Sequence, residues 1–244
     1  MAGTKAERQE TGLINIIKKS IKENEGNAIT ILSANKKKCI GIIDSDKFSG
    51  RQVSGSEPYI DVIFMQYSRT KINKLGLSLK GESAPSLAGG GLRGINLAVP
   101  GLADTFMKKS YQSLIKMGLL IGDKVPDVYG EISNNYKTKI VVGNKQMGGP
   151  IDYMYIGPMD VKGSYDSKKN ILSVNGNIYE AKEYAKTHKL FFRLRARRED
   201  QRFDPDAYKG NIPKIYGKSP SKGDSAGRIV VTDKVPSNAV IIKL

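Results

Sequence analysis

Two charged residues, Asp61 and Lys80, stand in otherwise apolar, strand-like segments of the chain. Asp61 lies in PYIDVIFM (58–65), and Lys80 lies near the end of KLGLSLKG (74–81). A carboxylate among aliphatic side chains is costly unless it pairs with a cation or binds a metal. A carboxylate and a lysine held together could bind a hard cation and orient a phosphate group. The ordinary alternative is a strand-end Asp that is partly solvated or paired with a nearby Lys.

The alternation of side chains in the second segment favours a shared site. Residues two apart in a strand lie on the same face, so Ser78 and Lys80 share one face while Leu77 and Leu79 share the other. The stretch from Val62 to Leu79 is long enough for a strand, a turn and a return strand. If the two strands pair, Asp61 and Lys80 converge.

This pattern resembles the PD-(D/E)XK nuclease superfamily, in which an acidic residue in one strand is followed by acidic-any-lysine in the next. YID supplies Asp61, and SLK supplies the second motif. The chain departs from the pattern at Ser78, where the family usually has Asp or Glu. The resemblance covers roughly residues 6–117. It implies an α/β fold with a central mixed β-sheet flanked by helices, a restriction-endonuclease-like core, and a strand-rich basic C-terminal part.

The resemblance also implies a glutamate on the first helix that completes a metal site. Glu10 lies at the edge of the apolar stripe of a helix predicted over 6–24, although the helix dipole also favours a solvated Glu in this position. If the strand continued, Glu82 would lie on the same face as Ser78 and Lys80, because the three residues are two apart. The implied cofactor is Mg²⁺, with Mn²⁺ as a substitute, and the implied function is hydrolysis of DNA phosphodiester bonds. The implied catalytic set is Asp61, Lys80, Glu10 and Glu82, the implied metal ligands are Asp61, Glu10 and Glu82, and further candidates are Glu57 and Asp104.

The net charge favours a polyanionic partner. Forty Lys and Arg oppose 24 Asp and Glu, which gives a formal charge of +16. Such a field attracts nucleic acid, DNA first, and the binding should weaken steeply with salt. A Lys-rich surface that serves only solubility is the plain alternative. A second functional hypothesis is therefore a non-catalytic nucleic-acid-binding or virion structural protein on the same fold.

The segment LFFRLRARR (190–198) is the main binding candidate. In a strand, Arg193, Arg195 and Arg197 would form a row with about 6.6 Å between neighbours, which is close to the phosphate spacing of one nucleic-acid strand. Arg198 extends the row. A solvated edge strand would give the same pattern. Arg93, after a run of three glycines, is a further phosphate donor.

The remaining pattern predicts one central sheet and two regions, a nuclease-like core over 1–203 and a basic loop with a C-terminal strand pair over 204–244. No apolar run is long enough to span a bilayer, and the single Cys39 suggests a core thiol in a cytoplasmic protein, of host cytoplasm or virion if the source is a phage.

A homodimer is among the expected assemblies, and zinc sites of the His/Cys type are excluded because His188 is the only histidine. Further predicted strands are 138–143 and 150–157, a hairpin is predicted over 170–180, and further helices are predicted over 102–120 and 181–189.

Overall fold

The computed structural model describes residues 3–53, 58–82, 91–195, 202–203, 216–219, 223–225 and 228–244. The chain divides into two compact units. The first unit comprises Met1–Pro85 and Val141–Tyr184, and the second comprises Ser86–Ile140 and Ala185–Leu244. This division differs from the expected boundary after residue 203, because the second unit includes a segment from the middle of the chain.

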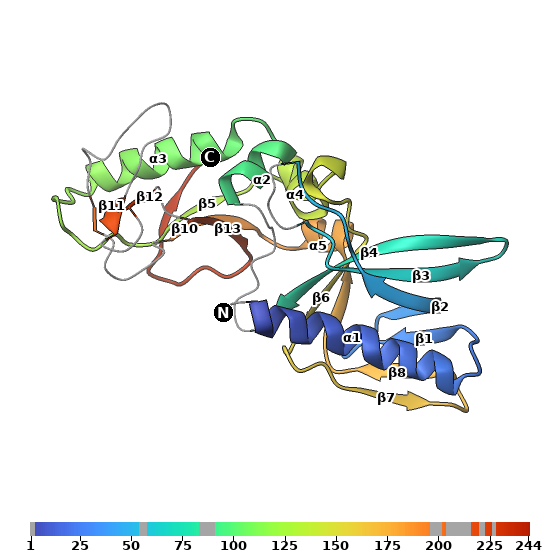
Figure 1. The fold of residues 1–244 in the computed structure, drawn as a ribbon. Helices are drawn as coiled ribbons and strands as arrows, with labels where there is room; N and C mark the ends of the chain where they lie inside the picture. Colours follow the sequence, from blue (N-terminus) through green and yellow to red (C-terminus); the bar gives the residue numbers. More distant parts are fainter. Residues whose placement is uncertain are drawn as a thin grey trace. The chain divides into compact units, whose positions relative to one another are not determined.

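The first unit contains helix α1 (Gly3–Glu23) and an eight-stranded sheet in the order β7-β8-β1-β2-β3-β4-β6-β9. Strands β2, β3 and β4 form an antiparallel series, whereas β4 and β6 run parallel, as do β1 and β8. The predicted α/β class with a mixed sheet flanked by helices is therefore confirmed (Figure 1). The strands are β1 (Ile29–Leu32), β2 (Lys38–Lys47), β3 (Val62–Ser68), β4 (Lys71–Gly81), β6 (Tyr153–Gly157), β7 (Gly163–Asp166), β8 (Ile171–Val174) and β9 (Asn177–Glu180).

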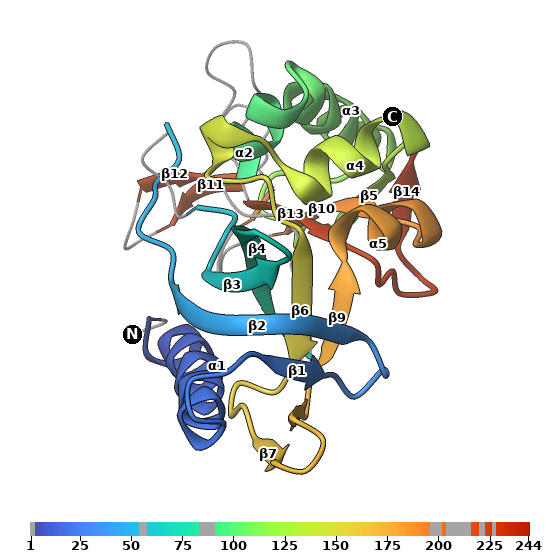
Figure 2. The ribbon, with the colours of Figure 1, turned by 90° about the vertical axis from the view of Figure 1, so that its right-hand side faces the viewer.

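The sheet wraps round instead of lying flat (Figure 2). The turn after β1 touches β9, the last strand in the order. There the Asn35 side chain donates to the Ile178 carbonyl at 2.9 Å and accepts from the Ile178 N–H at 3.1 Å. The hairpin predicted around Asn175 and Gly176 is wrong: both strands exist, but β8 pairs with β1 and β7, and β9 pairs with β6. Local sequence shows where strands lie, whereas their partners depend on distant segments.

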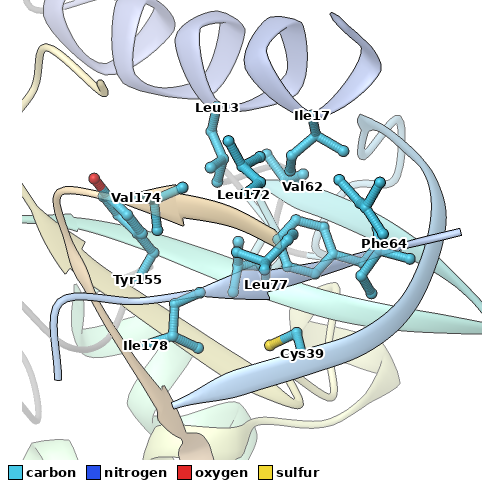
Figure 3. Packing of buried hydrophobic residues seen from close by; sticks show 13 residues of the cluster. Leu13, Ile17, Cys39, Val62, Phe64, Leu77, Tyr155, Leu172, Val174 and Ile178 are labelled. Atoms are coloured by element: carbon cyan, nitrogen blue, oxygen red, sulfur yellow. The ribbon is translucent and has the colours of Figure 1, made fainter. Parts of the chain in front are cut away.

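Helix α1 packs on the sheet through the apolar stripe that its sequence predicts. Leu13 and Ile17 are fully buried, and Figure 3 shows them pointing from the helix toward Val62, Leu77 and the other core residues. Burying each such side chain contributes about 1.5–3 kcal/mol. Cys39 is buried in the same cluster, as expected for a core thiol. The helix is thereby fixed against one face of the sheet.

The second unit contains a four-stranded sheet in the order β13-β10-β5-β14, so the expectation of one central sheet is wrong. The C-terminal strands β13 and β14 are not neighbours, because β10 and β5 lie between them. The expected C-terminal strand pair is therefore also wrong. The remaining elements of the chain are α2 (Gly91–Ala98), α3 (Leu102–Lys116), β5 (Val128–Glu131), α4 (Asn134–Val142), a 3-10 turn (Lys145–Met147), α5 (Ala181–Thr187), β10 (Phe191–Arg195), β11 (Tyr216–Ser219), β12 (Gly223–Ser225), β13 (Arg228–Thr232) and β14 (Val240–Ile242).

The predicted strand over 138–143 is a helix, α4. Its β-branched run Ile140, Val141 and Val142 is typical of strands, but all three side chains are buried from a helical backbone. The positive φ of Gly143, 71°, follows the end of the helix. The helices predicted over 102–120 and 181–189 are confirmed as α3 and α5, which end at Lys116 and Thr187.

Within the described part of the chain, no helix is both long enough and apolar enough to cross a membrane.

Candidate functional site

Asp61 lies immediately before β3 and is bonded to the neighbouring strand β4. Its Oδ2 atom accepts a hydrogen bond from the Ser78 hydroxyl at 3.1 Å and another from the backbone N–H of Leu79 at 2.6 Å. The Asp61 backbone N–H in turn donates to the carbonyl of Leu77 at 2.9 Å. Two donors on one oxygen fix the orientation of the carboxylate. The other oxygen, Oδ1, accepts no hydrogen bond from the described residues.

The two faces of β4 separate as the alternation predicts. Leu77 belongs to the core cluster beneath α1, and Leu79 packs against that cluster. Ser78 is buried on the opposite face, where its hydroxyl bonds Asp61. Lys80 lies two residues further along, on the same face as Ser78, and is partly exposed. No salt bridge joins the Lys80 ammonium to any residue that the structure describes. The structure therefore brings Asp61, Ser78 and Lys80 to one end of adjacent strands.

Glu10 lies near this end of the sheet, but its carboxylate is engaged. It forms a salt bridge with the Lys47 ammonium at 3.0 Å, and its side chain is only 15% exposed. The hydrogen bond to Glu10 is the main reason that the pKa of Lys47 lies above its usual value. The negative charges of Glu7 and Asp61 raise the pKa of Lys47 further. Lys47 therefore lies in the field of several carboxylates, and sequence reasoning missed it.

The buried Gln9 explains why this part of α1 lies at the end of β4. Its Nε2 atom donates to the carbonyls of Lys80, Gly157 and Pro158 at 3.3, 3.1 and 3.2 Å. These contacts tie the helix to the ends of two parallel strands, β4 and β6. Sequence reasoning missed Gln9 as well. The only local signal was a polar residue beside the apolar stripe of the helix.

Glu82 is exposed and follows the last residue of β4, Gly81. Burial raises the pKa of the Tyr155 hydroxyl to about 12, and the charge of Glu82 adds to this rise. The Tyr155 ring belongs to the core cluster on the α1 side of the sheet. The alternation that predicted Glu82 beside Lys80 does not extend past the end of the strand, so the structure gives no contact between Glu82 and Asp61.

The three expected metal ligands do not form one cluster. Among the residues that the structure describes, no three His, Cys, Asp or Glu side chains come together in a way that could hold a metal ion. Glu10 faces Lys47, and Glu82 lies beyond the strand. The donor chemistry fits a hard cation bound through Asp61 alone, since Mg²⁺ is commonly held by one or two carboxylates, waters and substrate phosphate oxygens.

The predicted arginine row begins with a residue that is already paired. The Nε of Arg193 donates to Asp127 Oδ2 at 2.8 Å, its Nη2 donates to the same oxygen, and the guanidinium lies 5.8 Å from the centre of the Tyr129 ring. Strand β10 lies between β5 and β13, so it is not an edge strand. Arg193 is thus held by its own sheet and is not presented as an open phosphate contact.

The structure describes only part of the remaining candidate set. Arg93 is exposed on α2 of the second unit. Asp104 accepts a hydrogen bond from the Asn96 side chain at 3.0 Å, while the Asn96 oxygen accepts one from the Ala103 N–H, so this pair organises the start of α3. Arg197, Arg198, Glu57 and the side chain of Arg195 lie outside the described residues.

Comparison of the chain with protein-family models, with curated proteins and with solved structures found no match.

Proposed function

We propose that the chain is a metal-dependent nuclease that hydrolyses DNA phosphodiester bonds. The observation that carries this proposal is the fixed Asp61 carboxylate, held by Ser78 and the Leu79 amide, with Lys80 one residue further along the same strand. A restriction-endonuclease-like core is part of the proposal. The order of a helix, four antiparallel strands and a later strand parallel to the fourth supports it, with β1 as an additional strand before the three that the family would supply.

The residues at this site have separable roles in the proposed reaction. A bound Mg²⁺ would lower the pKa of its water and offset the charge that develops on the phosphate. Asp61 would hold the cation through Oδ1, the oxygen that accepts no hydrogen bond from the described residues, while Ser78 and the Leu79 amide keep the carboxylate oriented. Lys80 would bind a phosphate oxygen or orient the attacking water, because its ammonium has no described carboxylate partner.

The charge of the chain supports nucleic acid as the substrate. A formal charge of +16 attracts a polyanion, and each phosphate contact steepens the loss of affinity with salt.

The decisive experiment measures cleavage of supercoiled and linear DNA with Mg²⁺ or Mn²⁺ by the wild type, Asp61→Asn and Lys80→Met. We expect each substitution to reduce the rate by about 10²-fold or more, because each removes an electrostatic contact to the transition state. Asp152→Asn is the matched control. Its carboxylate also accepts a backbone N–H of β4, from Gly76 at 2.8 Å, but it lies away from Lys80 in the strand register.

The proposal is wrong if pure wild-type protein cleaves no form of DNA, or if Asp152→Asn loses as much activity as Asp61→Asn at equal stability. In the second case, Asp61 would act only by joining β3 to β4.

One observation favours a second candidate, a non-catalytic nucleic-acid-binding or virion structural protein. Ser78 stands where the resembling family has its second carboxylate, and the described residues contain no three-carboxylate cluster. This candidate predicts salt-sensitive DNA binding without cleavage. A Mn²⁺ titration separates the two candidates, because only the nuclease requires metal binding that is lost in Asp61→Asn.

A further inference from the structure

The β3–β4 hairpin extends beyond the neighbouring strands of its sheet (Figure 1). The pairing of β2 with β3 ends at Gln66, and β6 pairs with β4 only from Leu77 to Gly81. Beyond these points Tyr67 pairs with Ile72 across the hairpin, and Ser68 pairs with Lys71. The β4 edge of the tip is therefore open from Leu75 to Lys71, whereas the β3 edge is reached by β2, where a Cβ on Gly41 would lie 2.9 Å from the Tyr67 carbonyl oxygen.

The site-bearing face of the hairpin presents an aromatic and an aliphatic side chain to solvent. In an antiparallel pair, directly opposite residues share a face, so Tyr67 and Ile72 lie on one face with Met65 and Lys74. Residues alternate along each strand, which places this face on the same side as Ser78 and Lys80. Tyr67 is 55% exposed and Ile72 is 57% exposed. Large apolar groups at such exposure, on a projecting element, indicate a binding surface.

The same face is closed near the site and opens further out. A Cβ on Gly76 would lie 2.8 Å from the Ile60 side chain and 3.1 Å from the Pro150 carbonyl oxygen, so these groups cover the sheet at that point. The exposed part begins at Lys74. A ligand that lay on the open part would reach the end of the sheet that carries Asp61 by passing Ile60.

The hairpin carries only positive charge. Between Asp61 and Glu82 the sequence contains no acidic residue, whereas Arg69, Lys71 and Lys74 are all exposed. Arg69 lies in the turn, Lys71 follows it on the face opposite to Tyr67, and Lys74 lies two residue pairs nearer to the site than Tyr67. An exposed aromatic ring among unopposed cations is the arrangement that binds single-stranded nucleic acid, because bases stack on the ring and phosphates bind the cations.

We propose that the β3–β4 hairpin binds a single-stranded segment of nucleic acid, with a base stacked on Tyr67 and phosphates contacted by Lys74 on the same face and by Arg69 at the turn. This inference rests on the proposed nucleic-acid function and specifies its substrate. A stacking ring requires an unstacked base, so the favoured substrate has a single-stranded tail or gap. Tyr67 lies six positions after Asp61, about 20 Å along the strand.

The test uses the absence of tryptophan from the sequence. Tyr67→Trp introduces a single tryptophan, which is excited selectively over the tyrosines and whose emission should be quenched when an oligothymidine binds and stacks on it. Tyr136→Trp is the matched control, on α4, where the native ring is 36% exposed. We expect quenching at position 67 and little change at position 136.

Affinity for the same oligothymidine is measured by fluorescence anisotropy in Tyr67→Ala, Tyr67→Phe and Lys74→Gln. Tyr67→Ala should weaken binding roughly 5- to 100-fold, whereas Tyr67→Phe should stay within about twofold because it keeps the ring. Lys74→Gln should reduce the slope of log affinity against log salt by about one. Tyr136→Ala should bind like the wild type.

The two proposals fail separately. If Tyr67→Ala binds oligothymidine as tightly as the wild type, or the tryptophan at position 67 is not quenched, the hairpin proposal is wrong, even if Asp61-dependent cleavage is observed. If the hairpin variants lose affinity but no DNA is cleaved, the hairpin proposal stands and the nuclease proposal is wrong.

Discussion

In the eight-stranded sheet of the first unit, the carboxylate of Asp61 is held by neutral donors, a hydroxyl and a backbone amide. In the four-stranded sheet of the second unit, the guanidinium of Arg193 is held by a carboxylate, Asp127, and by the ring of Tyr129. Neutral donors orient a charge and leave it uncancelled, whereas an ion pair cancels it. The first arrangement therefore leaves the carboxylate charge uncompensated by its hydrogen-bond donors, and the second pairs a charge within a sheet.

Arg193 comes from a segment in which polar and apolar residues alternate, whereas Asp61 comes from a segment that is otherwise apolar. In neither case did the segment itself identify the bonding partner. The predictions below address this contrast, from the largest expected effect to the smallest.

The interior of the first unit should keep its only thiol neutral. Burial raises the pKa of Cys39 to about 11, and only the thiolate reacts with alkylating reagents. At pH 8 we expect labelling by iodoacetamide to be slower than that of a free thiol by about two orders of magnitude. The labelling rate is measured by mass spectrometry under native conditions.

A matched control places a thiol one residue away, as Ile40→Cys in a Cys39→Ala background. The Ile40 side chain is 63% exposed, so the new thiol should react like free cysteine. Equal native labelling rates at positions 39 and 40 would show that the core of the first unit opens readily.

The second unit should depend on its ion pair. Arg193→Met leaves the Asp127 carboxylate, 31% exposed, without its guanidinium, and we expect the free energy of unfolding to fall by about 1–2 kcal/mol. Arg193→Lys should lose less stability than Arg193→Met because it keeps the positive charge. It should still lose some, because lysine lacks the guanidinium that lies over the Tyr129 ring. Urea denaturation followed by circular dichroism measures both.

A double-mutant cycle with Asp127→Asn measures the coupling free energy between Arg193 and Asp127. The claim that this ion pair stabilises the second unit is wrong if Arg193→Met is as stable as the wild type, or if the cycle gives no coupling at low salt.

Ser78→Ala tests the neutral hydrogen bond in the first unit. Removing one donor to Asp61 should lower the free energy of unfolding by about 1 kcal/mol, and the loss should change little with salt because Ser78 carries no charge. Ser164→Ala, at an exposed position of β7, is the control and should leave stability unchanged. A loss in Ser78→Ala that disappears in 1 M NaCl would contradict this assignment.

Glu10→Gln should have the smallest effect, about 0.5 kcal/mol, because Lys47 is 63% exposed and solvent screens the pair. The folded-state pKa of Lys47 lies above the value in the unfolded chain. The contribution of the pair is therefore fully present below the ordinary lysine pKa and is lost as the pH rises through the raised value. The difference in unfolding free energy between wild type and variant, measured from pH 8 to pH 11.5, should shrink with rising pH. A constant difference over this range would be the contrary result.

Local periodicity was sufficient to predict several parts of the fold and the site. The 3.6-residue spacing of Leu13 and Ile17 predicted α1 and its buried face. The alternation in β4 placed Ser78 and Lys80 opposite the core, and the length of the intervening segment predicted the β3–β4 hairpin. These predictions succeed because backbone geometry alone determines which residues of a helix or strand share a face.

Contacts across long sequence separations could not be predicted in this way. Gln9 bonds carbonyls 71 to 149 residues away, and Lys47 meets Glu10 only because β2 ends beside α1. The β-branched run in α4 favoured a strand, yet its packing made it a helix. Sequence by itself determined the faces of the helices and strands, whereas tertiary structure decided their partners. The physical reason is that a face follows from local backbone geometry, but a partner is chosen by burial and hydrogen bonding over the whole chain.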